Sequence, residues 1–161
     1  MSSQSACYLS ILMALVLALL LPLEGARATD DVGIVVNASV PVTNVSFNEL
    51  RRIFLGERQF WSSNLRVTLL MRAPAARERE VLLKDVYEMS EAQVRQHWIG
   101  KVFRAEAPSA PQMFYSDEEI LQAVAAIPGS IAAVDTTRVP KGLKVLRIDG
   151  HLPGEAGYRL R

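Results

Sequence analysis

The sequence contains 161 residues, of which 18 are Lys or Arg and 17 are Asp or Glu, giving a formal net charge of +1 at pH 7. This balance argues against a nucleic-acid-binding protein, which would carry a basic patch, and against a strongly acidic partner. Cys7 is the only cysteine, so no disulfide within the chain can stabilise the fold.

The N-terminal segment is predicted to be a signal peptide. Residues 9–21 are apolar and uncharged, which is the length of a signal-peptide core and short for a membrane span. Ala26-Arg27-Ala28 has the small-x-small pattern that signal peptidase cleaves, although residues 1–8 contain no Lys or Arg. We therefore expect a signal peptide at 1–28, a periplasmic domain at 29–161, and no stable membrane anchor after cleavage behind Ala28. The alternative is an uncleaved membrane anchor.

Strands are predicted where β-branched apolar runs occur, and helices where capping boxes precede apolar residues at helical spacing. The expected elements are a strand at 32–37, a helix from Ser46 to Gly56, a strand at 66–71, a helix from Arg77, a helix from Ser90 to about Phe103, a short strand at 112–115, a helix from Ser116 to about 127, and strands at 130–134 and 143–148. The alternation predicts an α/β fold with helices packed on a mostly parallel sheet.

Two apolar features allow more specific expectations. Phe60 and Trp61 lie in a predicted loop, where such a pair either seals the edge of the core or floors a ligand pocket. The helix from Ser90 carries an apolar face that is expected to be buried and consists of Val94, Trp98, Ile99 and Val102. A polar tail rich in glycine is expected to follow Gly150.

Catalysis finds little support in the sequence. It contains no G-x-S-x-G, H-E-x-x-H or P-loop motif. The two histidines, His97 and His151, have no nearby nucleophile or second ligand at metal-binding spacing. We therefore predict no enzyme activity, no metal site and no cofactor, leaving open a catalytic pair that is assembled only in the folded chain.

The turn at 73–76 is the candidate ligand-binding site. It lies between a strand that ends near Arg72 and a helix that starts near Arg77, and it offers no Ser, Thr, Asn or Asp to cap that helix. Free N–H groups at a helix start and a nearby guanidinium suit phosphate or sulfate. The predicted anion ligands are Arg72, Ala75, Ala76 and Arg77. In the alternative interpretation, water or Glu78 caps the helix and the arginines are solvated.

Several stretches resemble one lobe of the periplasmic phosphate-binding proteins of ABC transporters, the PstS type. The matching residues are Val35-Val36-Asn37, the helix from Ser46 to Gly56, Trp61, Arg72, His97-Trp98, Phe103 and the stretch from Pro128 to Val134. The resemblance implies a single three-layer lobe, similar to a periplasmic binding protein, with a mixed, mostly parallel sheet of about five strands. In that family the turn after the arginine is typically Ser-Gly-Thr, whereas Ala75-Ala76-Arg77 stands there in this chain.

The resemblance leads to two hypotheses for the function. The first is a solute-binding domain that holds phosphate or a similar oxyanion weakly at the turn from Arg72 to Arg77. The second is an envelope protein-interaction or sensing module that keeps the fold but has lost phosphate binding. The second hypothesis predicts an exposed apolar patch near Phe60, Trp61 or Phe114.

Overall fold

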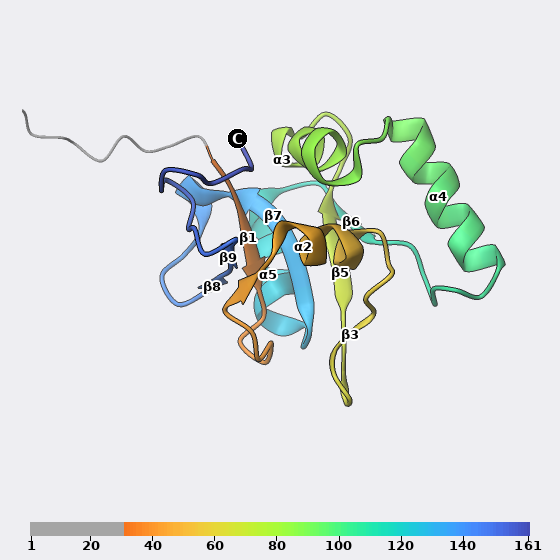
Figure 1. Ribbon diagram of the computed structural model, residues 1–161, viewed down its shortest axis with the longest axis horizontal. Helices are drawn as coiled ribbons and strands as arrows, with labels where there is room; N and C mark the ends of the chain where they lie inside the picture. Colours follow the sequence, from red (N-terminus) through yellow and green to blue (C-terminus); the bar gives the residue numbers. More distant parts are fainter. Residues whose placement is uncertain (1–30) are drawn as a thin grey trace, which may run out of the picture.

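The computed structural model describes residues 31–161 and contains a five-stranded sheet with the strand order β6-β5-β7-β1-β8 (Figure 1). The predicted signal peptide at 1–28 lies outside the described residues. The strands of this sheet are β6 (Gln112–Phe114), β5 (Thr68–Arg72), β7 (Ser130–Asp135), β1 (Val32–Val36) and β8 (Lys144–Val145). Across residues 31–161, no helix combines the length and the apolarity that a bilayer crossing requires.

The sheet is mixed, with one strand reversed. β5 runs parallel to both β6 and β7, while β1 pairs antiparallel with β7 and with β8. Every residue of β1, VGIVV, is buried, as expected for a strand that is covered on both faces. The predicted α/β fold with a mixed sheet of about five strands is therefore confirmed.

The helices are α2 (Phe47–Phe54), α3 (Arg77–Val81) with its π-helical continuation η1 (Leu82–Tyr87), α4 (Glu91–Phe103), α5 (Asp117–Ala126) and the 3-10 helix η2 (Thr136–Arg138). Three of them, α2, α4 and α5, begin where a capping serine predicts. Complete capping boxes start α2 and α4. At α5 the box is incomplete, because the Glu119 carboxylate accepts a hydrogen bond from the N–H of Tyr115 instead of that of Ser116.

Four short strands lie outside the main sheet. Because of them, the boundaries predicted for the strands at 143–148 and 66–71 were wrong. β2 (Asn44–Val45) pairs in parallel with β9 (Arg147–Ile148), and β3 (Phe60–Ser62) pairs antiparallel with β4 (Leu65–Arg66). The single strand predicted at 143–148 is thus split between two sheets at Leu146. This residue is fully buried and donates its N–H to the carbonyl of Ile34. The strand predicted at 66–71 starts at Thr68, because the N–H of Val67 donates to the carbonyl of Gln59 beside the β3–β4 hairpin.

The C-terminal tail is part of the core, contrary to the prediction of a polar tail. Leu160 is fully buried, and its carbonyl accepts a hydrogen bond from the N–H of Val32. The Tyr158 hydroxyl is also buried and donates to the carbonyl of Val32 at 2.7 Å. The apolar positions are separated by polar and glycine residues, so sequence periodicity gave no signal for this segment.

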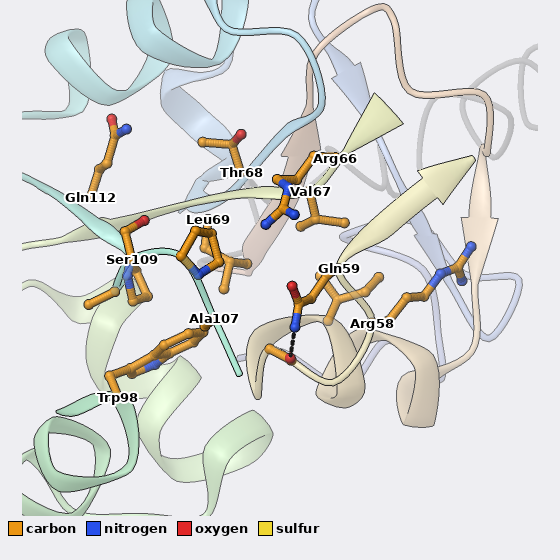
Figure 2. A pocket seen from close by; sticks show the side chains of 15 residues that line it. Arg58, Gln59, Arg66, Val67, Thr68, Leu69, Trp98, Ala107, Ser109 and Gln112 are labelled. Carbon is orange, nitrogen blue, oxygen red and sulfur yellow. Dashed lines mark hydrogen bonds between the residues drawn. The ribbon is translucent and has the colours of Figure 1, made fainter. Parts of the chain in front are cut away.

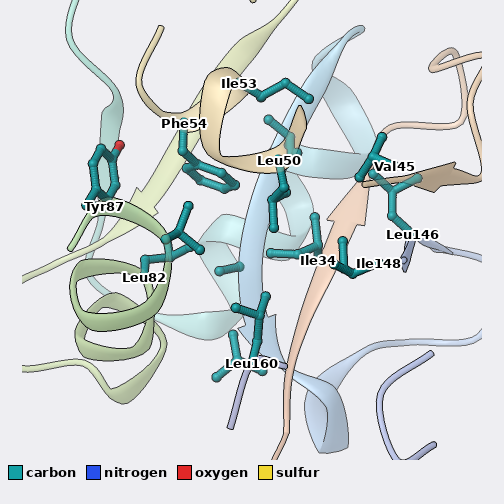
Figure 3. Packing of buried hydrophobic residues seen from close by; sticks show 14 of the residues in the cluster. Ile34, Val45, Leu50, Ile53, Phe54, Leu82, Tyr87, Leu146, Ile148 and Leu160 are labelled. Carbon is teal, nitrogen blue, oxygen red and sulfur yellow. The ribbon is translucent and has the colours of Figure 1, made fainter. Parts of the chain in front are cut away.

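Two apolar clusters cover the two faces of the sheet and make the fold three-layered. Figure 3 shows the larger one, in which Ile34 on β1 meets Leu50 and Phe54 on α2 and Leu82 on η1. The smaller cluster joins β5 and β7 to α5 through Leu70, Ile120 and Val124. Burying one such side chain contributes roughly 1.5–3 kcal/mol, which is the main force that holds α2 and α5 on opposite faces.

Trp61 seals the core, while its neighbour remains accessible. Trp61 is buried, and its indole N–H donates to the carbonyl of Gly129 at 2.9 Å. Phe60 is 46% exposed and packs against the guanidinium of Arg66. Of the two roles considered for this pair, sealing the core edge is the one that Trp61 fulfils.

α4 buries less of its apolar surface than predicted. Val94 and Trp98 are buried, but Ile99 and Val102 are 55% and 40% exposed, and Phe103 is 89% exposed. In Figure 1, α4 stands at one side of the molecule, away from the layers that α2 and α5 form. The prediction of a single buried apolar face was wrong because only one of the helix's two apolar stripes meets the body of the domain.

A buried arginine ties the start of α4 to α3. Arg79 is 6% exposed, its Nε donates to the Glu91 carboxylate at 2.9 Å, and its Nη1 donates to the carbonyl of Arg72 at 2.9 Å. The hydrogen bonds and charge of Arg79 lower the pKa of Glu91 below its ordinary value. Arg79 is therefore a structural link between α3 and α4.

Gly129 provides a first test of the fold. Its φ is +73°, and a Cβ placed on it would lie 2.1 Å from the Arg66 carbonyl oxygen. Gly142 also has a positive φ, of +103°, but has open space around it. We expect Gly142→Ala to cost about 1 kcal/mol for backbone strain, and Gly129→Ala to cost about 1–3 kcal/mol more for the overlap. Urea denaturation measures both, and equal costs would contradict the close approach of Arg66.

The Arg79–Glu91 pair provides a second test. A carboxylate whose folded-state pKa is lowered stabilises the fold above its unfolded pKa, near 4.3, and this contribution disappears as the pH falls through the folded pKa. Glu91→Gln should therefore lower the free energy of unfolding by about 1 kcal/mol at neutral pH, with the difference from wild type shrinking below about pH 4. Urea denaturation at several pH values measures this.

The control for Glu91→Gln is Glu88→Gln. Glu88 forms an ion pair with Arg51 but is 61% exposed, so its replacement should change stability little at any pH. A Glu91→Gln variant that behaves like Glu88→Gln would show that the link between α3 and α4 contributes no stability.

Candidate functional site

The carboxyl ends of the parallel strands β6, β5 and β7 meet at one edge of the sheet, which is where open α/β folds bind ligands. Arg72 is the last residue of β5, Phe114 ends β6 and Asp135 ends β7. The turn at 73–76 and the starts of α3 and α5 follow these strands. We call this edge the Arg72 corner. The four predicted anion ligands, Arg72, Ala75, Ala76 and Arg77, all lie in or beside it.

Two carboxylates of the chain face the Arg72 guanidinium. Its Nε lies 3.1 Å from Asp117 Oδ1 and 3.9 Å from Glu78 Oε2, and its Nη1 donates to the Phe114 carbonyl at 3.4 Å. The side chains of Arg72 and Glu78 are only 12% and 10% exposed. Two carboxylates of the same chain, Asp117 and Glu78, thus compensate the charge of Arg72.

The Arg72–Asp117 pair is close but poorly aligned. The distance fits an ion pair, yet Arg72 Nε and Asp117 Oδ1 are both buried and form no aligned hydrogen bond within residues 31–161. Asp117 belongs to the first turn of α5, together with Glu118 and Glu119. These three acidic side chains already satisfy the preference of a helix N-terminus for negative charge.

The turn at 73–76 has the open helix start that the sequence indicated. Ala76 is extended and makes no side-chain cap, and Ala75 has a φ of 69°, a conformation uncommon for a residue with a Cβ. Arg77 is exposed.

Asp135, at the end of β7, also belongs to this corner. Burial raises the pKa of Asp135, but hydrogen bonds from Thr137 and the charges of Arg77 and Arg138 outweigh burial, so that the pKa lies below its ordinary value.

Sequence reasoning missed the acidic half of this corner. Glu78 was considered only as a helix cap, and Asp117 and Asp135 were not considered at all. Asp117 follows the capping residue Ser116 directly after the short strand β6. The carboxyl ends of parallel strands meet at one edge of a sheet. The predicted topology could therefore have indicated that Asp117 lies beside Arg72.

Neither histidine belongs to a cluster of potential metal ligands within residues 31–161. His97 is half-buried, and its Nε2 lies 2.9 Å from the carbonyl oxygen of Leu55. In the described part of the chain, no group of three or more His, Cys, Asp or Glu side chains is placed to hold a metal ion.

A small cavity with a mixed polar and apolar lining lies at the opposite end of β5. Figure 2 shows Arg58, Arg66, Thr68 and Gln112 among its lining residues, with Gln59 donating a hydrogen bond to the carbonyl of Gly56. Its volume is about 200 Å³, below the roughly 300–1,000 Å³ of typical ligand pockets. Arg58 forms an ion pair with Glu49, and Arg66 covers Phe60. The cavity is therefore a weak candidate for ligand binding.

A larger apolar groove of about 590 Å³ runs between α4 and the edge strand β6. Its apolar lining includes Val94, Trp98, Ile99, Val102, Phe103 and Met113. We call it the α4 groove. The exposed apolar patch that the second hypothesis requires thus exists on α4 and β6, and on β6 it includes Met113, the neighbour of Phe114. Of the three residues named in that prediction, Phe60 is exposed, Phe114 is half-buried and Trp61 is buried.

Comparison by sequence gives no relatives: no protein-family model matches the chain, and no curated protein matches it. Comparison of structures gives clear matches to phosphate-binding proteins. A phosphate ABC transporter substrate-binding protein from Clostridium perfringens, solved with bound phosphate, matches with a TM-score of 0.60 and 13% identity over 76% of this chain and 47% of its own.

Two further structures give the same result. An ABC-type phosphate transport receptor from Vibrio cholerae matches with a TM-score of 0.61 and 16% identity, covering 78% of this chain and 49% of its own. PstS from Borrelia burgdorferi matches with a TM-score of 0.58 and 16% identity, covering 77% and 49%. The chain spans about half the length of these structures, and it has the fold of that half, as the resemblance implied.

Proposed function

We propose that this chain is an envelope protein-interaction module that keeps one lobe of the phosphate-binding-protein fold without using the Arg72 corner to bind phosphate. The observation that carries the proposal is the compensation of Arg72 by Asp117 and Glu78, at 3.1 and 3.9 Å. The likeness to phosphate-binding proteins supports the fold at 13–16% identity, and the proposal assigns no catalytic activity.

The charges at the corner argue against an added anion. Two like charges about 4 Å apart repel by about 4 kcal/mol at the effective dielectric near a protein surface. A helix N-terminus favours an anion by roughly 0.3–1 kcal/mol. An oxyanion at Arg72 would meet Asp117 and Glu78, and their repulsion offsets the attraction of the guanidinium, which leaves the small contribution of the open start of α3. Phosphate would have to displace a carboxylate to bind there.

The α4 groove supports the protein-binding half of the proposal. Ile99 and Phe103 are 55% and 89% exposed, and they border a groove with a largely apolar lining. Exposed apolar surface of this kind marks interaction sites in folded proteins. Export to the periplasm remains part of the proposal and rests on the predicted signal peptide at 1–28.

The second candidate function is weak oxyanion binding at Ala75, Ala76 and Arg77. It is favoured by the uncapped start of α3 and by the exposed Arg77. Phosphate or sulfate would then bind outside the Arg72–Asp117 pair.

Thermal unfolding in phosphate, sulfate and chloride at matched ionic strength distinguishes the two candidates. A ligand at ten times its dissociation constant stabilises the folded state by about 1.4 kcal/mol. We expect millimolar phosphate and sulfate to leave the wild-type melting temperature at its chloride value. A rise in phosphate or sulfate that Arg72→Ala or Arg77→Ala removes would instead establish the oxyanion function.

The variant Asp117→Ala tests the reason for the expected insensitivity. Removing this carboxylate leaves a buried guanidinium poorly compensated, which should cost about 1–3 kcal/mol. It should also allow phosphate to raise the melting temperature of the variant. The control Glu118→Ala removes the same charge from the same helical turn, where the side chain is exposed. An equal phosphate response in both variants would contradict a specific role for Asp117.

A further inference from the structure

The α4 groove is bordered by an apolar stripe that nothing in the domain covers. Arg95, Ile99 and Phe103 are four residues apart on α4 and therefore share one face. Each of the three is exposed and lines the groove. The neighbouring stripe, with Val94 and Trp98, packs into the core. The open stripe is apolar at Ile99 and Phe103 and basic at its N-terminal end, at Arg95.

The opposite wall of the groove is an open sheet edge. β6 is the first strand of the sheet, and its only partner within residues 31–161 is β5. The Phe114 carbonyl points toward β5, where it accepts the N–H of Ala73. Because backbone groups alternate sides along a strand, Met113 directs its N–H and C=O away from β5. An extended chain can pair with such an edge.

The charged residues at the groove indicate the sign of the charge that an occupant would carry. Arg79 and Glu91 line it but neutralise each other through their hydrogen bonds. Arg95 is exposed, and its charge acts on Glu91 without an ion pair between them. Two arginines and one glutamate thus line this end of the groove and leave a net positive charge there. A carboxylate on the occupant would complement this charge.

We propose that the α4 groove binds an extended segment of a partner protein, which adds to the β6 edge. The segment carries apolar side chains at alternate positions and an acidic side chain beside Arg95. The stripe from Arg95 to Phe103 rises about 12 Å along the helix, which matches about four residues of extended chain. The inference rests on the proposed function and names the kind of partner that the module takes.

The test is selection from a phage-displayed library of random peptides on the full-length chain. We expect enriched peptides that combine alternating apolar residues with Asp or Glu at one fixed position. On Arg95→Glu, the same library should yield peptides with Lys or Arg at that position. Arg52→Glu reverses a charge on α2, outside the groove lining, and should leave the acidic preference unchanged.

Two variants test the walls of the groove with a single enriched peptide. Phe103→Ala removes apolar contact surface, and Met113→Pro removes the outward N–H, a replacement that an edge strand tolerates. Each should weaken binding by tenfold or more in a fluorescence titration. Phe60→Ala removes another exposed phenyl group, one outside the groove, and should have no effect.

The inference is overturned if no peptide is enriched, or if enriched peptides bind equally to Phe103→Ala and Met113→Pro. It is also overturned if light scattering shows a dimer that Phe103→Ala dissociates and the peptide competes with, because the occupant is then a second copy. The phosphate titration is independent of these outcomes: a phosphate response contradicts the proposed function, whereas a failed selection removes only this choice of partner.

Discussion

The charge of Arg72 is the constraint on which the rest of the binding edge depends. The residue ends a central strand, and its side chain is only 12% exposed, so the guanidinium cannot be satisfied by water alone. A fold of this type can supply the missing negative charge from a ligand or from its own side chains. In this chain Asp117 and Glu78 are the carboxylates nearest to Arg72. The corner can therefore be stable without a bound anion.

The order of strands determines which parts of that corner the sequence can predict. Capping boxes and apolar runs locate most helices and strands, because these signals are local. The Arg72–Asp117 contact joins residues 45 positions apart, and it depends on β6 lying next to β5. No local pattern carries that information. The burial of Leu160 beside β1 is hidden for the same reason.

α4 shows a different limit of prediction from sequence. Its five large apolar residues look like one broad face, yet only Val94 and Trp98 are buried. Periodicity tells which residues share a side of a helix, but not how many of its sides meet the domain. That number is set by the packing of α4 in the folded chain, where the stripe with Val94 and Trp98 meets the core and the stripe with Ile99 and Phe103 is exposed.

The closed corner and the open groove are joined by one series of polar contacts. Asp117 faces Arg72, the Arg72 carbonyl accepts a hydrogen bond from Arg79, and Arg79 holds Glu91 at the start of α4. This edge needs no bound anion to compensate the charge of Arg72, because Asp117 and Glu78 supply the negative charge. A different pair, Arg79 with Glu91, holds the first turn of α4, and it is linked to the corner through the backbone carbonyl of Arg72. A rigid helix start reduces the ordering cost of binding, so the Arg79–Glu91 pair would favour the peptide binding proposed for the α4 groove.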